Sequence, residues 1–169
     1  VRSMRQDGTD LRDHGRIDDP AGNQSVIFTP SVLGSDYFIG VGSSSLRMQK
    51  VFAVLAEDVS PRLVIDLDDG DGYRSFRVLG TPSTTYLLAQ GFSRSSIYAL
   101  RPSEPPERIY RRNLAISPDV AGPIFAATIG NSLVFDAPTA SFDAMEPWVS
   151  DGTAAGTRQL ATLAPGVSC

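Results

Sequence analysis

The feature that most constrains the fold is a repeat of about 48 residues in the pattern of short apolar segments. Segments rich in Val, Ile, Phe and Tyr recur along the chain, and each is bounded by Gly, Pro, Ser or Asp, which is typical of β-strands. They form three successive sets of four: 25–29, 36–41, 50–56 and 62–67; 75–80, 85–90, 96–100 and 107–112; and 123–128, 132–137, 146–150 and 157–163. The sequence therefore predicts an all-β protein with four strands in each repeat.

Corresponding strands of the three sets keep a nearly constant spacing. The first strands centre on Phe28, Phe76 and Phe125, which are 48 and 49 residues apart, and the other three strands recur at spacings of 46 to 50 residues. A four-stranded unit repeated about every 40 to 50 residues is the blade of a β-propeller, in which each blade packs against the blades before and after it. The expected fold is thus a β-propeller segment of four-stranded antiparallel blades.

A repeated turn sequence extends this register to the N-terminus. Asp-Gly-Thr occurs at residues 7–9 and again at residues 151–153, a separation of 144 residues or three periods of 48. Residues 1–18 are then the second half of an earlier blade, so about three and a half blades are expected. The complete blades are assigned to residues 24–67, 75–112 and 123–163, and residues 164–169 to the start of a connection to a further blade.

The stretch EPWVSDGTAAGTRQL at residues 146–160 is interpreted as two strands joined by a hairpin turn. Asp-Gly suits such a turn because glycine adopts positive φ at little cost. The carboxylate of Asp151 and the hydroxyl of Thr153 can accept hydrogen bonds from nearby backbone N–H groups. Trp148 is expected to hold the third strand against its neighbours. A binding loop explains these residues less well, since the turn accounts for all of them.

Two likenesses to propeller families rest on these motifs. Residues 146–166 resemble the repeat E-L-W-x-S-D-G-T-x-x-G-T-x-L-V-x-D-I-x-P-G of large bacterial, often secreted, proteins. The matching residues are Glu146, Trp148, Ser150, Asp151, Gly152, Thr153, Gly156, Thr157, Leu160, Pro165 and Gly166, whereas Pro147 and Thr162 depart from the repeat. The N-terminus is similar to the TolB-type propeller repeat through Met4, Asp7, Gly8 and Arg12. The resemblance implies a propeller fold and an exported bacterial protein, and it implies no catalytic residues.

Three and a half blades do not close a ring, because propellers usually have 4–8 blades. The sequence opens on the last two strands of a blade and ends with a complete blade, so its N-terminal strands cannot complete the last one. We therefore expect an excerpt of a larger propeller, whose remaining blades are partners of this segment. A half-ring that assembles with other copies is the alternative.

Composition narrows the function classes. The net charge is −4 and the 14 arginines look scattered, which argues against the basic surface that nucleic-acid binding requires. His14 and Cys169 are the only residues of their types, so neither a zinc site nor a Ser-His-Asp hydrolase is expected. No apolar run approaches the length of a membrane span, about 18 residues or more.

One acidic segment is a candidate calcium site. Residues 66–75, DLDDGDGYRS, combine carboxylates with a glycine turn, as hard cations require. Their spacing does not match the loop D-x-D-x-D-G in either frame, so a solvated connection between blades is the preferred interpretation. We accordingly expect no metal, no cofactor and no enzymatic activity, with calcium as the alternative.

Candidate ligand contacts come from analogy with other propellers. Their ligands usually bind over the central channel, on the face formed by the fourth-to-first and second-to-third strand loops. The residues expected on this face are Arg47, Arg94, Asp69, Asp71, Tyr73 and Asp143.

The expected function is a non-enzymatic scaffold or recognition surface for protein or carbohydrate, in the extracellular space or the periplasm. The alternative is the propeller domain of a larger enzyme, such as the gating domain ahead of a serine-peptidase catalytic domain.

Overall fold

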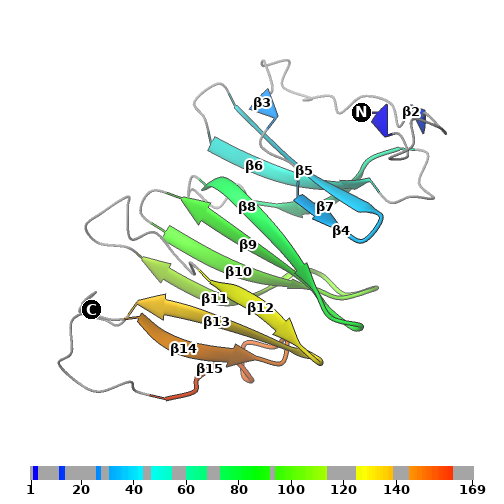
Figure 1. The fold of residues 1–169 in the computed structure, drawn as a ribbon. Coiled ribbons are helices and arrows are strands. Elements are labelled where there is room, and N and C mark those ends of the chain that lie inside the picture. Colours follow the sequence, from blue (N-terminus) through cyan, green and yellow to red (C-terminus); the bar gives the residue numbers. More distant parts are fainter. Residues whose placement is uncertain are drawn as a thin grey trace. The chain divides into compact units, whose positions relative to one another are not determined.

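The computed structural model of the chain describes residues 2–3, 12–13, 26–27, 31–43, 47–54, 60–67, 73–91, 94–113, 125–138 and 145–161. Every regular element in these stretches is a β-strand, which confirms the all-β prediction (Figure 1). The chain divides into two units, Val1–Gly72 and Tyr73–Cys169. No helix in the described part is long and apolar enough to cross a membrane.

The first unit contains one four-stranded antiparallel arrangement built around β5 (Asp36–Ser43). One edge of β5 pairs with β3 (Val26–Ile27) and β4 (Ser31–Leu33), which together line it as a single interrupted strand. Its other edge pairs with β6 (Arg47–Val54), and β6 pairs in turn with β7 (Arg62–Asp66). In the same unit, β1 (Arg2–Ser3) and β2 (Arg12–Asp13) form a two-stranded antiparallel sheet.

The second unit begins with a sheet of four consecutive antiparallel strands. They are β8 (Tyr73–Gly80), β9 (Thr85–Gly91), β10 (Arg94–Leu100) and β11 (Glu107–Asn113). Each strand pairs with its neighbour in the sequence, in the order β8-β9-β10-β11. Short connections permit this order, because antiparallel neighbours can be joined by tight turns.

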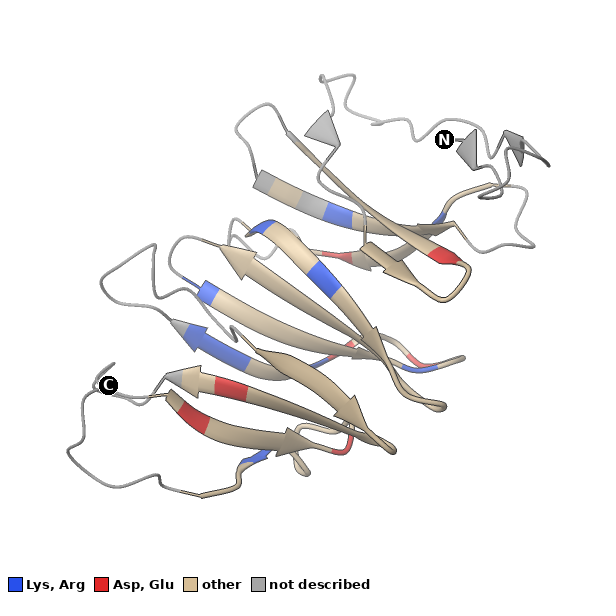
Figure 2. Ribbon diagram, viewed as in Figure 1, with Lys and Arg blue, Asp and Glu red and all other residues tan. Residues whose placement is uncertain are grey.

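A further four-stranded sheet follows in the second unit. Its strands are β12 (Ala126–Ile129), β13 (Ser132–Pro138), β14 (Met145–Ser150) and β15 (Arg158–Gln159), again paired in sequence order. The charges differ between the two sheets: basic residues lie on β8, β10 and β11, and acidic residues on β13 and β14 (Figure 2). The structure thus confirms three four-stranded antiparallel sheets along the chain.

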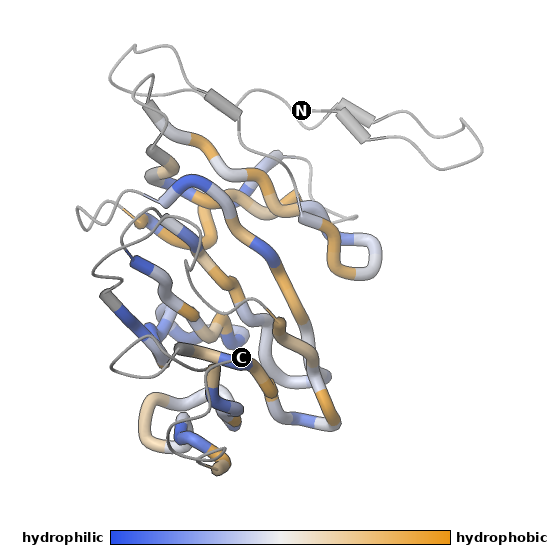
Figure 3. The backbone as a smooth tube through the Cα atoms, turned by 60° about the vertical axis from the view of Figure 1, so that its left-hand side comes forward, coloured by the Kyte–Doolittle hydropathy of each residue, from blue (hydrophilic) through white to orange (hydrophobic). Residues whose placement is uncertain are grey.

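The side chains that point to one face of β13 are buried. Leu133, Phe135 and Ala137 of β13 are buried, whereas the residues between them are only half-buried. The same alternation appears as hydrophobic and hydrophilic stretches along the strands of the second unit (Figure 3). Because successive side chains of a strand point to opposite faces, β13 buries one face, whereas β9 and β10 are buried on both faces.

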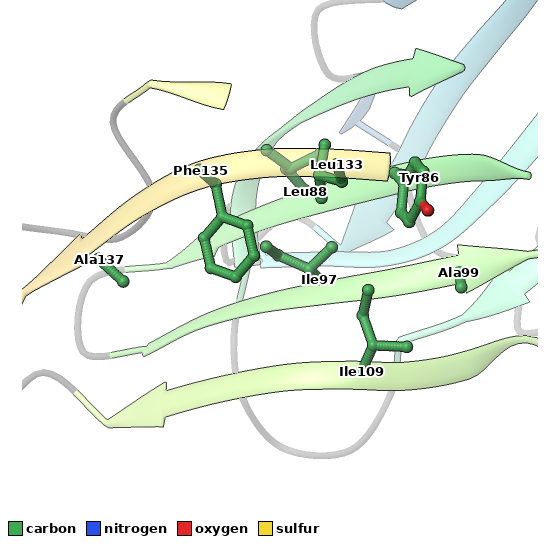
Figure 4. Packing of buried hydrophobic residues seen from close by; sticks show 8 residues of the cluster. All are labelled: Tyr86, Leu88, Ile97, Ala99, Ile109, Leu133, Phe135 and Ala137. Carbon is green, nitrogen blue, oxygen red and sulfur yellow. The ribbon is translucent and has the colours of Figure 1, made fainter. Parts of the chain in front are cut away.

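The core of the second unit lies between its two sheets. Its buried members come from β9, β10, β11 and β13 and comprise Tyr86, Leu88, Ile97, Ala99, Ile109, Leu133, Phe135 and Ala137 (Figure 4). Leu79, Tyr110, Ala126 and Trp148 pack against this cluster while remaining partly exposed. The two sheets therefore bury their facing sides against each other. In the first unit, Ile39, Val41 and Val54 form a smaller buried cluster with Phe52 packed on it.

Three aromatic rings join the two sheets of the second unit. The ring of Tyr110 in β11 meets Phe135 and Trp148 edge-on, at centroid distances of 5.2 and 5.5 Å. Phe135 and Trp148 stack at 6.2 Å on neighbouring strands. Edge-to-face and offset-stacked pairs at such distances are favourable beyond the burial of their surfaces. Trp148 thus holds the third strand of its sheet in place, as the sequence predicts.

We expect Phe135→Ala to lower the free energy of unfolding by about 3–5 kcal/mol, because it empties a buried site between two sheets. Chemical denaturation measures the change. Phe125→Ala is the matched control: this ring is 71% exposed, so its loss should change stability little. Equal effects of the two substitutions would show that the face-to-face packing does not stabilise the unit.

Candidate functional site

The best-defined polar site of the second unit is the turn at residues 150–157 between β14 and β15. The carboxylate Oδ1 of Asp151 accepts hydrogen bonds from the backbone N–H of Thr153 at 2.9 Å and from its hydroxyl at 2.8 Å. The hydroxyl of Thr153 in turn accepts a hydrogen bond from Gly156 N at 2.9 Å. This confirms that Asp151 and Thr153 cap backbone groups of the turn, as the sequence suggests.

The two hydroxyl residues that flank the turn close it. The hydroxyl oxygens of Ser150 and Thr157 lie 2.7 Å apart, and Ser150 Oγ accepts a hydrogen bond from Gly152 N at 3.1 Å. Thr157 Oγ1 donates to the carbonyl oxygen of Thr153 at 2.6 Å. Each polar residue of the motif S-D-G-T-x-x-G-T therefore has a defined structural task within the turn.

Gly152 lets this turn approach the neighbouring sheet. Its φ is +97°, a conformation that side chains disfavour, and it is buried. A Cβ at this position would lie 3.2 Å from Thr84 Oγ1 and 3.3 Å from the hydroxyl of Tyr86. A Cβ at Gly156 would overlap the carboxylate of Asp151. The glycines thus allow a close contact across the sheets as well as a change of chain direction.

An ionic cluster, which we call the Arg101 clamp, joins the β10–β11 loop to the same turn. Arg101 donates to Glu104 through Nε and to Glu107 through Nη2, each at 2.6 Å, and its Nη1 donates to the carbonyl oxygen of Gly152. Glu107 also accepts a hydrogen bond from Ala154 N at 3.0 Å. The clamp therefore fastens the turn of one sheet to the end of the other.

The clamp changes the acidity of its groups. Hydrogen bonding from Arg101 lowers the pKa of Glu107, and hydrogen bonding from the Thr153 hydroxyl lowers the pKa of Asp151. Hydrogen bonds to the two glutamates raise the pKa of Arg101. All three groups therefore favour their charged forms when folded. Asp151 is exposed and Arg101 and Glu107 are only half-buried, so solvent screens part of the resulting stabilisation.

The polar side chains of this arrangement are engaged in bonds within the fold. The hydroxyls of Ser150, Thr153 and Thr157 and the carboxylates around Arg101 bond to each other or to the backbone. Across the residues that the structure describes, no group of three or more His, Cys, Asp and Glu side chains is placed to hold a metal ion.

The ligand-face candidates occupy several different places. Tyr73 lies in β8 rather than in the loop before it and is completely buried. Its hydroxyl donates to Ser96 Oγ at 2.8 Å and lies 3.2 Å from the Tyr98 hydroxyl. The placement of Tyr73 in the loop before the strand is therefore wrong, because β8 begins two residues earlier than its apolar pattern suggests.

The remaining candidates are two arginines and three aspartates. Arg94 is the half-buried first residue of β10 and stands opposite Asn113. It lies at the same end of its sheet as Tyr73, which stands opposite Gly91. Arg47 begins β6 in the first unit. Asp69, Asp71 and Asp143 lie outside the described residues.

Sequence reasoning missed the Arg101 clamp. The available signal was the spacing of Arg101, Glu104 and Glu107 in RPSEPPER, which places two carboxylates after one arginine in a short loop. That spacing does not reveal the third partner, the carbonyl oxygen of Gly152, since it lies 51 residues away.

No protein-family model matches the chain, and searches of curated proteins and of solved structures also return no match.

We expect Gly152→Ala to destabilise the protein more than Gly130→Ala. Both glycines have positive φ, and a side chain there costs about 1–2 kcal/mol. Only Gly152 also faces atoms that a Cβ would crowd, since nothing lies within 4 Å of a Cβ at Gly130. Thermal unfolding of the two variants measures the difference, and equal losses would contradict the close contact.

The Arg101 clamp should make stability depend on acidic pH. Folding lowers the pKa of Glu107 and of Asp151. Each carboxylate therefore stabilises the fold above its unfolded pKa, which is about 4.3 for Glu and 3.9 for Asp. This stabilisation is lost as the pH falls through the folded pKa. Arg101→Gln should therefore flatten the loss of stability between neutral pH and about pH 3. Denaturation midpoints across this range, with Arg62→Gln in β7 as control, test this. An unchanged slope in Arg101→Gln would contradict it.

Proposed function

We propose that the chain is a segment of a β-propeller that acts as a non-enzymatic scaffold or recognition surface for protein or carbohydrate. The observation that carries this proposal is the face-to-face packing of two successive four-stranded sheets in the second unit. Successive blades of a propeller pack in this way.

The strand registers of the two sheets support the repeat. In the first of these sheets Leu87 stands opposite Tyr98, and in the second Phe135 stands opposite Trp148. These pairs are separated by 48 residues on one strand and 50 on the other, which agrees with the period of the sequence. On the other face of each sheet, Tyr86 stands opposite Ala99 and Val134 stands opposite Val149. The same alignment makes these two pairs correspond.

This alignment identifies a face of the β12–β15 sheet that a further blade would cover. Tyr86 and Ala99 are fully buried beneath the next sheet, whereas Val134 and Val149 are only half-buried. We call the corresponding surface the outer face. It comprises Phe125, Ala127, Ile129, Val134, Pro147, Val149 and Leu160, and Phe125 and Ile129 are 71% and 67% exposed. Exposed apolar surface of this kind favours contact with another sheet.

The polar clusters of the second unit support a scaffold. The turn at residues 150–157 is bonded within itself and through the Arg101 clamp to the neighbouring sheet. These bonds favour a fixed arrangement of the two sheets of the second unit. Loops at the end of the sheets opposite to this turn can then present contact residues. In this proposal the candidates of each unit contribute to recognition separately, Arg94 and Asp143 in the second unit and Arg47, Asp69 and Asp71 in the first, in an exported bacterial protein.

Binding to glycan and peptide arrays tests the recognition function. We expect a ligand whose binding is weakened by Arg94→Glu and retained by Arg158→Glu, since Arg158 lies in β15 of the other sheet. Catalytic turnover of a ligand by the wild-type protein, or no binding on either array, would overturn the proposal.

The outer face should cause the isolated chain to self-associate. Phe125→Asp combined with Ile129→Asp should reduce this association, because charged residues replace the two most exposed apolar side chains of the face. Size-exclusion chromatography with light scattering measures the effect, and Val32→Asp in β4 is the control at an exposed position in the other unit. A wild-type monomer that melts cooperatively would contradict the need for a covering sheet.

A further inference from the structure

The β8–β11 sheet carries a strong positive charge within an acidic protein. Residues 73–113 contain seven arginines and two glutamates, a net charge of +5, whereas the whole chain has −4. The segments on either side, 1–72 and 114–169, carry −5 and −4. Half of the 14 arginines thus belong to one sheet, which corrects the expectation that they are scattered. Figure 2 shows basic residues along β8, β10 and β11.

The carboxylates of this sheet do not balance its charge. Its two glutamates, Glu104 and Glu107, both bind Arg101. Six further arginines belong to the sheet: Arg74, Arg77, Arg94, Arg108, Arg111 and Arg112. Of these, four are exposed and the other two, Arg94 and Arg112, are half-buried. The residues of the sheet therefore carry a net positive charge, most of it on exposed side chains.

Strand β11 concentrates this excess at an edge. Arg111 stands opposite Ser96, and Arg108 stands opposite Tyr98. Ser96 and Tyr98 are two positions apart on β10 and share one face, so the two arginines lie on that same face of the sheet. Arg112 stands opposite Ser95 and hence lies on the other face. Within the described part of the chain, β11 pairs only with β10 in its sheet. The far edge of β11 thus combines backbone donors and acceptors with arginines on both faces.

We propose that the outer edge of β11 binds an acidic peptide segment as an added strand. Backbone hydrogen bonds to a sheet edge require an extended polypeptide, which favours a peptide over a polysaccharide or a nucleic acid. Acidic side chains of the added strand would stand opposite the arginines, and opposite charges at such cross-strand positions are favourable. Arginines on the edge also disfavour pairing with a second β11, because like charges would then meet.

This inference rests on the proposed recognition function and names one partner class for it. The acidic peptide is proposed to bind at the edge strand β11, whereas the ligand recognised by Arg94 and the loop candidates is proposed to bind at the end of the strands. The two parts can therefore fail separately.

Fluorescence anisotropy with a short labelled peptide rich in Glu and Thr tests the proposal. We expect Arg108→Glu combined with Arg111→Glu to weaken binding by about tenfold or more, because two attractive contacts become repulsive. Arg74→Glu combined with Arg77→Glu in β8 is the matched control, since it makes the same change of charge on another strand of the sheet. Arg108→Gln with Arg111→Gln should give an intermediate loss, and circular dichroism establishes that each variant is folded.

Two further ligands separate strand addition from simple charge attraction. A peptide of the same charge with proline at alternate positions should bind at least about tenfold more weakly, because proline lacks the N–H that an added strand donates. Heparin, a polyanion without a peptide backbone, should not distinguish the β11 variant from the β8 variant. Equal binding of the two peptides, or a β11-specific loss with heparin, would overturn the proposal.

Absence of acidic-peptide binding to the folded wild-type protein would also overturn it. If array ligands that depend on Arg94 still bind, only the β11 inference fails, whereas loss of all binding refutes the recognition function as well. Self-association of the β11 variant with unchanged peptide affinity would show that the arginines serve only to prevent strand pairing.

Discussion

The packing of the turn at residues 150–157 against the neighbouring sheet depends on the absence of a side chain at Gly152. The backbone there comes within reach of Thr84 and Tyr86, and Arg101 binds the Gly152 carbonyl oxygen. This contact secures one end of a face-to-face pair of sheets, between which Tyr110, Phe135 and Trp148 pack together. The motif is thus both a turn within one sheet and a contact between two.

The charges of the second unit serve two different roles. Around Arg101 they are paired with each other and hold loops together at short range. Along β11 they lie at a sheet edge, where unpaired backbone groups otherwise invite uncontrolled strand pairing. An edge of this kind can admit an oppositely charged strand and reject a like-charged one. The same residue type therefore bonds to the neighbouring sheet at one place and carries the proposed selectivity of the β11 edge at the other.

The sequence predicted most strands because their apolar patterns are local. The segments 85–90, 96–100 and 107–112 correspond closely to β9, β10 and β11, since each is a short apolar or alternating run between turn residues. The first strand of the first unit was less well predicted. The structure describes β3 within the expected strand at 25–29, and the additional strand β4 pairs with β5 through a hairpin that the apolar pattern does not reveal.

The sequence by itself determined the all-β class, the succession of four-stranded sheets and the internal structure of the Asp-Gly-Thr turn. These properties depend on alternation along a strand and on hydrogen bonds between residues a few positions apart. Only the tertiary structure decided that Tyr73 is buried, that Arg101 reaches Gly152 and that arginines of β11 lie on both faces of a sheet edge. Those properties depend on contacts and registers between segments distant in the sequence, which a local pattern does not encode.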